Sequence, residues 1–363
     1  MGKDSGAMHL FLRMHHSLVV IGAGQAGLAV GYYLRRAGLL DSTVVFDAEE
    51  QAGGAWQHTW PSLTLFSPRD ASSLPGMLFP PTRGLYPTRD EALAYLRAYE
   101  ERYALPVQRP VEVRTVNHNG SMFTLDTSAG QCTANVVIGC TGTWRNPIIP
   151  EIPGRQQFNG SILHSAFYRG PTPLIGKRVI VVGGGNSGAQ IFADLVDHCQ
   201  VQWAVLHQPT YLPDDVDGRV LFDAATMRRM ALESGKGAST APSVTLGDIV
   251  MVDSVRRLRD EGRLTPVAMF EAFTPTGVRW SNGAEAEVDV VVFATGFRAA
   301  LGPFAELNLA DAQGRIEMRG TAVAQRPGLY LVGYGGWTGY ASATMIGVGQ
   351  TAKWTVDDIV AGR

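Results

Sequence analysis

The chain has 363 residues, of which 45% are hydrophobic and 18% are charged, and its formal net charge is −2 at pH 7. This composition predicts a packed globular protein long enough for two domains, and the near-neutral charge offers no electrostatic basis for binding nucleic acid or an anionic membrane. The three cysteines, Cys132, Cys140 and Cys199, include no C-x-x-C pair, which argues against a disulfide framework or a dithiol redox site and favours a reduced, cytoplasmic setting.

The first 16 residues lack the apolar stretch of a signal peptide, and we expect residues 1–16 to be a disordered lead-in. No later run reaches the roughly 18 apolar residues that a membrane-spanning helix needs, so no membrane partner is expected.

A first glycine motif lies in the stretch SLVVIGAGQAGLAV, where an apolar strand leads into a glycine turn and a helix expected over residues 25–38. In such a motif the first glycine bends the chain, the second lets the backbone approach a pyrophosphate, and the third lets helix and strand pack closely. The next strand ends at Asp47, and 47 minus 27 is 20, the spacing expected for a carboxylate that binds a ribose hydroxyl. The predicted contacts with this dinucleotide are Gly22, Gly24, Gln25, Ala26, Gly27 and Asp47.

A glycine pair at residues 53 and 54 follows, with Trp56 close behind. The pair could let the backbone pass a second face of the pyrophosphate, and it equally fits an ordinary turn. We therefore add Gly54, Ala55 and Trp56 to the candidate cofactor contacts. Further along, Thr88 and Glu91 predict a capping box for a helix over residues 87–105, and alternating stretches around residues 111–128 and 270–283 predict small antiparallel sheets.

The stretch KRVIVVGGGNSGAQI, residues 177–191, repeats the motif and indicates a second nucleotide. Its second strand is expected to end at His207, where neither the acid typical of NADH sites nor the Arg typical of NADPH sites is present. A histidine can donate to a hydroxyl or, when protonated, pair with a phosphate, which predicts weak discrimination between NADH and NADPH; an ordinary loop residue is an equally good interpretation. The predicted contacts are Gly183, Gly185, Asn186, Ser187, Gly188, Leu206, His207 and Gln208.

Two apolar runs, NVVIGCTGTW and DVVVFATGFR, both close in T-G, as if two excursions of the chain returned to nucleotide domains. We place Thr295 and Gly296 of the second run at a cofactor. The last unit, residues 328–360, reads as a strand, a glycine-rich turn and a helix capped by Ser342 or Thr344. The fold expected is α/β, with two dinucleotide-binding, Rossmann-like domains: an NAD(P)-binding domain at 170–287, inserted into a discontinuous FAD-binding domain at 17–169 and 288–363.

The segment FNGSILHSAFY matches the pattern F-x-G-x-x-x-H-x-x-x-Y at Phe158, Gly160, His164 and Tyr168. With the two glycine motifs around it, this segment resembles the fingerprint of the flavin-containing monooxygenases, a group of class B flavoprotein monooxygenases, and in particular their short soluble bacterial branch with a relaxed NADH/NADPH preference. The related Baeyer-Villiger enzymes end the pattern in Trp followed by Pro or Asp. Here Arg169 follows Tyr168, which favours heteroatom oxygenation over ketone insertion. From the residues alone, a hydrogen-bonded linker histidine is the simpler interpretation of His164.

The resemblance implies an enzyme in which NADPH or NADH reduces FAD, the reduced flavin and molecular oxygen form a C(4a)-hydroperoxide, and a small thioether, amine or ketone takes one oxygen atom. It implies site residues Phe66, His164 and Tyr168, no metal, and a family in which homodimers are common. Members usually carry an Asn in a T-N-x-P segment, whose amide helps to hold the peroxide. The matching stretch here, LTLFSPRD, has Phe66 instead, and because a phenyl ring cannot donate a hydrogen bond we expect slow turnover that leaks hydrogen peroxide.

Other functions stay open at this point. Baeyer-Villiger oxygenation of ketones, an NAD(P)H oxidase that mainly releases hydrogen peroxide, and a flavoprotein that binds or senses without turnover all fit the two nucleotide motifs. A flavin disulfide reductase also has two such motifs, but it needs a redox dithiol that the cysteines do not supply.

Overall fold

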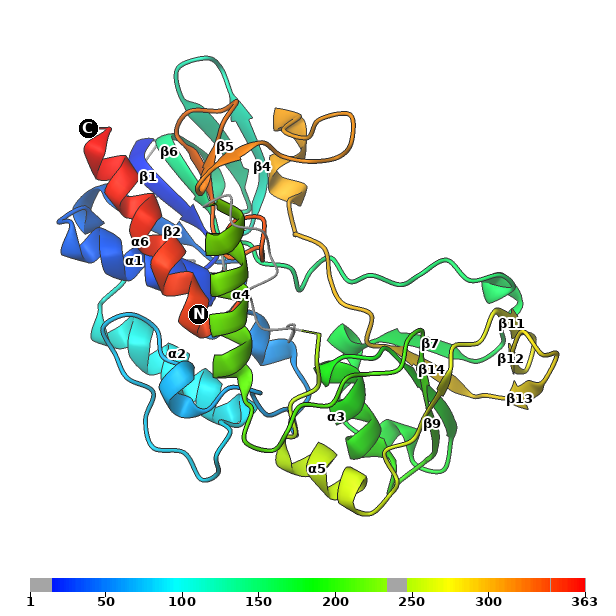
Figure 1. The fold of residues 1–363 in the computed structure, drawn as a ribbon. Coiled ribbons are helices and arrows are strands. Elements are labelled where there is room, and N and C mark those ends of the chain that lie inside the picture. Colours follow the sequence, from blue (N-terminus) through cyan, green and yellow to red (C-terminus); the bar gives the residue numbers. More distant parts are fainter. Residues whose placement is uncertain (1–14, 234–246, 340, 363) are drawn as a thin grey trace, which may run out of the picture.

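The computed structural model describes residues 15–233, 247–339 and 341–362. Residues 1–14 of the predicted lead-in lie outside the described residues, whereas His15 and His16 belong to the first strand and not to a lead-in. Figure 1 shows two lobes joined by extended segments, one leading toward β7 and one following β14.

The first lobe contains a nine-stranded sheet to which both ends of the chain contribute. Its order is β15-β16-β17-β6-β1-β2-β3, with β4 and β5 joined to β6 as an antiparallel arm, as predicted for residues 111–128. Strands β17, β6, β1, β2 and β3 run parallel. The strands are β1 (His15–Ile21), β2 (Thr43–Phe46), β3 (Val107–Gln108), β4 (Val113–His118), β5 (Phe123–Thr127), β6 (Gly130–Gly139), β15 (Met318–Arg319), β16 (Ala322–Val323) and β17 (Leu329–Leu331).

The second lobe contains five parallel strands in the order β10-β9-β8-β14-β7. They are β7 (Ser161–His164), β8 (Arg178–Val182), β9 (Gln200–Val205), β10 (Pro266–Ala268) and β14 (Val290–Phe293). Because β7 and β14 lie outside residues 170–287, this sheet favours an inserted unit that begins before β7 and ends after β14. A three-stranded antiparallel sheet of β11 (Ala272–Thr274), β12 (Gly277–Arg279) and β13 (Glu285–Glu287) confirms the prediction for residues 270–283.

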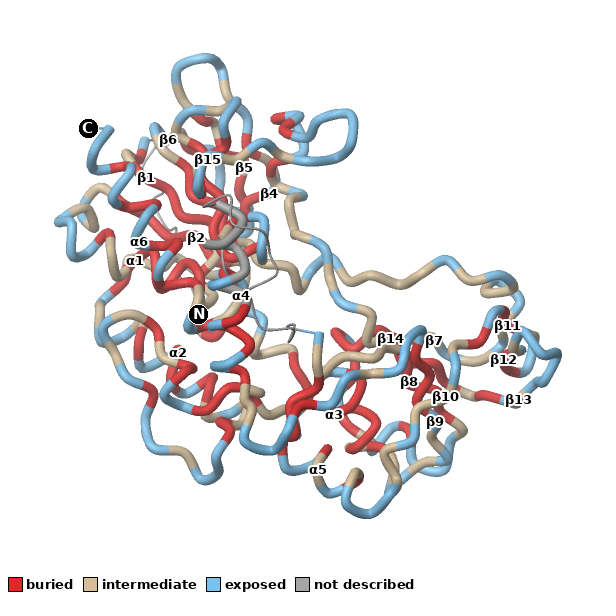
Figure 2. The backbone as a smooth tube through the Cα atoms, in the orientation of Figure 1, coloured by how far each residue is buried: buried red, intermediate tan, exposed pale blue. Residues whose placement is uncertain are grey.

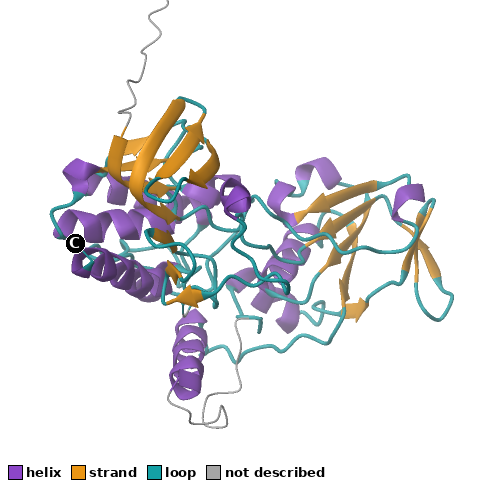
Figure 3. Ribbon diagram, turned by 90° about the horizontal axis from the view of Figure 1, so that it is seen from above, coloured by secondary structure: helices purple, strands orange, loops and turns teal. Residues whose placement is uncertain are grey.

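Helices pack beside the sheets of both lobes, whereas α4 (Gly218–Glu233) projects away from the strands (Figure 3). The other helices of the described residues are α1 (Gln25–Arg36), α2 (Arg89–Arg102), α3 (Asn186–Leu195), α5 (Asp253–Asp260) and α6 (Met345–Ala361). The predicted capping box of Thr88 and Glu91 opens α2, and of the two candidate caps of α6 it is Thr344 that accepts the Gly347 N–H. Buried residues gather on the strands and on the helix faces turned toward them (Figure 2). Within the described ranges no helix has the length and apolarity to cross a membrane.

Steric constraints explain the glycines of both motifs. Gly22 has φ +102°, and a Cβ there would lie 2.5 Å from the Cys140 carbonyl oxygen, while a Cβ on Gly27 would lie 1.9 Å from the Gly22 oxygen. The second motif repeats this arrangement, with Gly183 at φ +133° and a Cβ on Gly188 placed 2.0 Å from the Gly183 oxygen. Side chains at these positions would force strand and helix apart. The α/β fold with two such motifs is therefore confirmed.

Candidate active site

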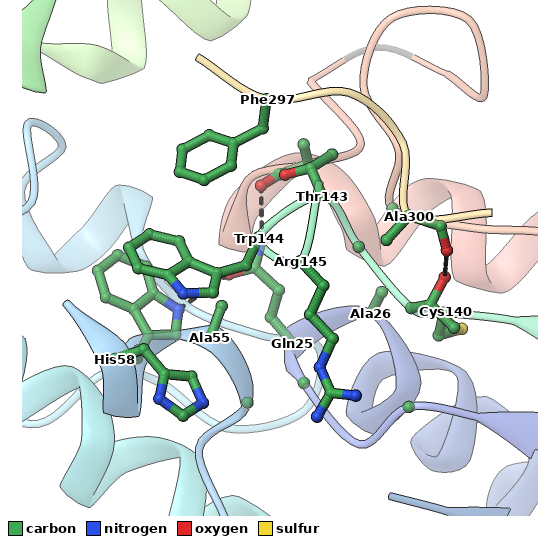
Figure 4. Close-up of a pocket in the computed structure, with 18 of the residues that line it drawn as sticks. Gln25, Ala26, Ala55, His58, Cys140, Thr143, Trp144, Arg145, Phe297 and Ala300 are labelled. Atoms are coloured by element: carbon green, nitrogen blue, oxygen red, sulfur yellow. Dashed lines mark hydrogen bonds between the residues drawn. The ribbon is translucent and has the colours of Figure 1, made fainter. Parts of the chain in front are cut away.

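A cavity of about 1030 Å³ extends from the glycine turn of the first lobe to helix α3 of the second. Its volume lies at the upper end of the range of roughly 300–1,000 Å³ that ligand pockets usually have, which suits an extended ligand. Figure 4 shows part of its wall. The predicted contacts that line it are Gly22, Gly24, Gln25, Ala26, Asp47, Gly54, Ala55, Trp56, Phe66, Asn186 and Ser187.

One part of the wall has the features of a phosphate site. Helix α1 has Gly24 as its N-cap residue, with no side-chain cap and no acidic residue in the first turn. Its free N–H groups and its dipole can therefore accept an anion. The turn at Gly54, with φ +54°, faces it so closely that a Cβ on Gly54 would lie 2.7 Å from the Gly24 Cα. Two glycine turns thus meet where a pyrophosphate could lie between backbone groups.

The side chain of Gln25 joins three separate segments around this turn. Its Nε2 donates to the Ala343 carbonyl oxygen at 2.6 Å, and its Oε1 accepts the Trp56 indole N–H at 3.2 Å (Figure 4). The C-terminal glycine-rich turn is thereby fixed to the start of α1. Each end of the amide thus has a protein partner, and Gln25 fixes the shape of the wall beside the Gly24 turn.

Asp47 lies at the end of β2 and is 5% exposed. Its Oδ2 accepts from Arg109 at 3.1 Å, and Arg109 also binds Glu100 through two bonds of 2.6 and 2.8 Å. Burial raises the pKa of the Asp47 carboxyl, and the Arg109 guanidinium offsets only part of that rise. The Oδ1 atom has only a 3.5 Å contact with the Glu49 N–H, which leaves it available to a hydroxyl donor.

Charged groups gather beside Asp47. Glu49 accepts from the His58 imidazole at 2.8 Å and from Arg145 at 3.1 Å. Figure 4 shows His58 and Arg145 on the same side of the cavity. This end suits the polar part of a ligand, such as a ribose.

One wall of the cavity is mainly apolar and carries no charged side chain. It is formed by Trp60, Leu63, Thr64, Leu65, Phe66, Ser67 and Phe222 of α4. The rings of Phe66 and Phe222 lie 6.2 Å apart, and the Phe66 carbonyl oxygen accepts the Gly218 N–H at 2.8 Å. Trp60 in the same wall has a buried indole N–H that lacks a partner among the described residues. Buried donors are seldom left unpaired, so this one fits a site where a ligand supplies the acceptor.

Helix α3 brings the second motif to the cavity. Its N-cap residue, Gly185, also leaves the N-terminus without a side-chain cap. The Asn186 amide donates to the Asp248 carbonyl oxygen at 3.0 Å and accepts the Val250 N–H at 2.9 Å, so it holds the 248–250 segment in place. Ser187 lines the cavity beside it.

The residues predicted to contact the second ribose lie apart from the cavity lining. Strand β9 ends at Val205 and not at His207. Leu206, His207 and Gln208 form an exposed turn after it, with Leu206 77% exposed. This turn is open to a nucleotide bound at the N-terminus of α3, and the contacts themselves stay a prediction.

The fingerprint residues lie behind the wall. His164 is fully buried; its Nδ1 accepts the Ala166 N–H at 3.1 Å, so its Nε2 carries the proton and faces the Gly296 carbonyl oxygen at 3.0 Å. The ring packs edge-on against Phe297, which stacks on Trp144 with centroids 5.0 Å apart. Phe297 and Trp144 line the cavity (Figure 4). His164 therefore does not line the cavity itself but packs against Phe297, which does.

Two further predicted residues, Tyr168 and Thr295, form hydrogen bonds to other parts of the protein. Tyr168 is 1% exposed, and its hydroxyl donates to Asp194 at 2.7 Å. The Thr295 hydroxyl donates to the Ile148 carbonyl oxygen, which joins the two extended segments between the lobes. Neither side chain is part of the cavity lining.

The sequence reasoning missed Arg109, Gln190 and the stacking pair of Trp144 and Phe297. The two residues lie just after the two T-G turns. The turns could be predicted from the sequence, whereas the stacking of the two aromatic rings could not. Arg109 contacts Asp47 across 62 positions and Gln190 contacts Thr64 across 126, and no local spacing indicates these bonds.

Comparisons with known proteins cover both lobes. A family model described as pyridine nucleotide-disulphide oxidoreductase matches residues 19–222. The solved flavin-containing monooxygenase from Stenotrophomonas maltophilia is 44% identical with a TM-score of 0.86, over 96% of this chain and 99% of that one. An uncharacterized oxidoreductase CzcO-like of Geobacillus kaustophilus is 31% identical over 94% of this chain and 98% of its own length. The indole-3-pyruvate monooxygenase YUCCA8 of Oryza sativa subsp. indica is 28% identical over 95% and 90%, respectively.

Proposed function

Because this chain belongs to the pyridine nucleotide-disulphide oxidoreductase family and is a flavin-dependent monooxygenase, we propose that it oxygenates soft heteroatoms, above all the sulfur of small thioethers. Amines are the second proposed substrate class. The observation that carries the proposal is the uncharged, mainly apolar wall that contains Phe66 and Phe222. Such a wall admits a neutral soft nucleophile and excludes water, and a thioether needs no enzyme base to remove a proton before it reacts.

FAD is the proposed flavin because the phosphate turns lead to a ribose site. The backbone at Gly24 and Gly54 would hold the pyrophosphate, and the Oδ1 of Asp47, which has a long 3.5 Å contact with the Glu49 N–H, would accept from the ribose of the adenosine half. Bound FAD would supply the electron transfer and the oxygen activation. The protein's own contribution is to bind the cofactor, keep the apolar wall dry and orient the substrate.

The reduced nicotinamide nucleotide is proposed to bind at the uncapped N-terminus of α3. The neighbouring turn of Leu206, His207 and Gln208 offers neither an acid nor an arginine to select between the two nucleotides. We therefore propose that NADH and NADPH both serve.

Disulfide reduction, the activity in the name of the matching family, has little support in this chain. All three cysteines are free thiols. Burial raises the pKa of Cys132 to about 11 and also raises that of Cys140, so both stay protonated and unreactive at neutral pH.

Release of hydrogen peroxide is a second candidate activity, and one specific observation favours it. Phe66 lines the cavity, and in the sequence it stands where the resembled family usually has the Asn of its T-N-x-P segment. Loss of that donor supports poor coupling of NAD(P)H oxidation to product formation.

The test is to purify the yellow protein and oxidise NADH in air with and without a methyl aryl sulfide. A cyclic ketone is assayed in parallel, and sulfoxide, lactone and hydrogen peroxide are quantified. Sulfoxide above the background without enzyme supports the proposal. Lactone alone would indicate Baeyer-Villiger oxygenation, peroxide alone an oxidase, and no oxidation of NADH a binding role.

A further inference from the structure

Gln190 of helix α3 holds the segment that carries Phe66. Its Oε1 accepts the Thr64 N–H at 3.1 Å, and its Nε2 donates to the Thr64 carbonyl oxygen at 3.1 Å. The side chain is 5% exposed, and 126 positions separate the two residues. A side-chain amide that satisfies both backbone groups of one residue acts like the edge of a neighbouring strand.

The other edge of the same segment is bound to the first lobe. Leu65 donates its N–H to the Pro87 carbonyl oxygen, and Arg89 donates its N–H to the Leu63 carbonyl oxygen. Residues 63–65 therefore lie between the start of α2 on one side and Gln190 on the other. The Gln190 amide therefore links α3 of the second lobe to this wall.

Gln190 lies one helical turn after Asn186, at the end of α3 where the nucleotide is proposed to bind, and both residues line the cavity. We propose that Gln190 is a positioning residue that transmits nucleotide occupancy at the N-terminus of α3 to the Phe66 wall of the flavin pocket. A displacement of α3 moves the Gln190 amide, and Thr64 follows because both of its backbone groups are bound to that amide. The inference rests on the proposed nucleotide site and is independent of the substrate that is oxygenated.

A second contact supports the coupling of this wall to the same lobe. Gly218 at the start of α4 donates its N–H to the Phe66 carbonyl oxygen, and a Cβ on Gly218 would lie 2.8 Å from that oxygen and 2.9 Å from the Phe66 Cδ2. Gly218→Ala would thus press directly on Phe66. It provides an independent perturbation should a Gln190 variant fold poorly.

The experiment measures amide hydrogen exchange in peptides covering residues 62–67 of the FAD-loaded enzyme, with and without saturating NADP⁺ and NAD⁺. In the unaltered enzyme, bound nucleotide is expected to slow exchange there about fivefold or more. Gln190→Met is expected to lose this protection while the Kd for nucleotide changes less than about threefold. Gln202→Met, the same substitution on an exposed side chain of β9, is the matched control and should keep the protection.

Gln190→Glu supplies a conservative rescue. The ionised carboxylate can still accept the Thr64 N–H but cannot donate to the Thr64 carbonyl oxygen, whereas the protonated form can do both. Burial favours protonation, so the nucleotide-dependent protection should be lost at pH 8 and return toward pH 6. A merely structural defect would not recover in this way.

Equal protection in Gln190→Met and the unaltered enzyme would overturn the proposal. So would a rise of more than tenfold in the nucleotide Kd of Gln190→Met, because the residue would then act in binding. Nucleotide binding without any protection at residues 62–67 in the unaltered enzyme would overturn the coupling alone. Absence of nucleotide binding would overturn it together with the proposed site. Failure to form sulfoxide would affect only the proposed function.

Discussion

His164 donates a hydrogen bond from its Nε2 to the carbonyl oxygen of Gly296 at 3.0 Å, across 132 positions of the chain. This bond joins the end of β7 to the second T-G turn. Its donor is a neutral imidazole, because the Nδ1 atom already accepts the Ala166 N–H. His164 therefore links two segments through a buried hydrogen bond. Protonation of its ring affects the stability of the fold.

His164→Gln should flatten the pH dependence of stability. Burial lowers the pKa of His164, although the bond to Gly296 opposes part of that shift. A lowered pKa means that the unfolded chain binds the proton first, so stability is full above the unfolded pKa near 6.5 and falls as the pH drops toward the folded value. The unaltered enzyme should lose up to about 1.4 kcal/mol more than His164→Gln between pH 7.5 and 5.5. Urea unfolding at both pH values measures this, and parallel losses would contradict it.

Arg109→Met should destabilise the protein by about 3 kcal/mol at pH 7.5, because the buried Asp47 and the partly buried Glu100 lose their shared cation. Burial already raises the pKa of Asp47, and without Arg109 the pKa should rise further. The cost is present above that raised pKa and absent below the unfolded value, so it should shrink at pH 5. Arg114→Met, which removes an exposed ion pair of 3.9 Å with Asp126, is the control and should cost less than about 1 kcal/mol. Equal effects of the two substitutions in chemical unfolding would rule the explanation out.

Phe66→Asn should improve coupling by returning an amide donor to the cavity wall. One added hydrogen bond of about 1.4 kcal/mol corresponds to a roughly tenfold lower ratio of hydrogen peroxide to sulfoxide. Phe66→Leu, which removes the ring without adding a donor, is the matched control and should leave the ratio high. Tight coupling in the unaltered enzyme, or an equal ratio in both variants, would refute the prediction.

His207→Arg should create a preference for NADPH, because a guanidinium binds the 2′-phosphate of NADPH. The exposed turn of the unaltered enzyme has no arginine to do so. A charged hydrogen bond of about 1.5–3 kcal/mol predicts a gain of roughly tenfold to a hundredfold in the NADPH:NADH ratio of kcat/KM. His207→Gln should leave the ratio close to that of the unaltered enzyme. A preference above about a hundredfold, near 2.7 kcal/mol, in the unaltered enzyme would end the prediction of relaxed selection.

The glycine motifs could be predicted from the sequence because their constraints are local. Position 27 must be a glycine because a Cβ there would lie 1.9 Å from the Gly22 carbonyl oxygen. Both residues belong to one short stretch of strand, turn and helix. Two element ends differ from the prediction: α1 ends at Arg36 and not at Gly38, and β9 ends two residues before His207.

Bonds between distant segments could not be predicted in the same way. The Gln190 amide finds Thr64 only after both lobes are folded, and a glutamine within a helix carries no sign of its partner. The same is true of the bond between Arg109 and Asp47, which follows β2 and lies 62 positions away. The family resemblance indicated His164 and Tyr168 as site residues, whereas their contacts in the folded chain are with Gly296 and Asp194.

Strand β17 lies between β16 and β6, and Gly333 and Thr344, which follow it, line the cavity. During synthesis the ribosome has completed nine-tenths of the polypeptide before these pieces exist. The cavity wall can therefore close only after the segment that carries Gly333 and Thr344 has left the exit tunnel.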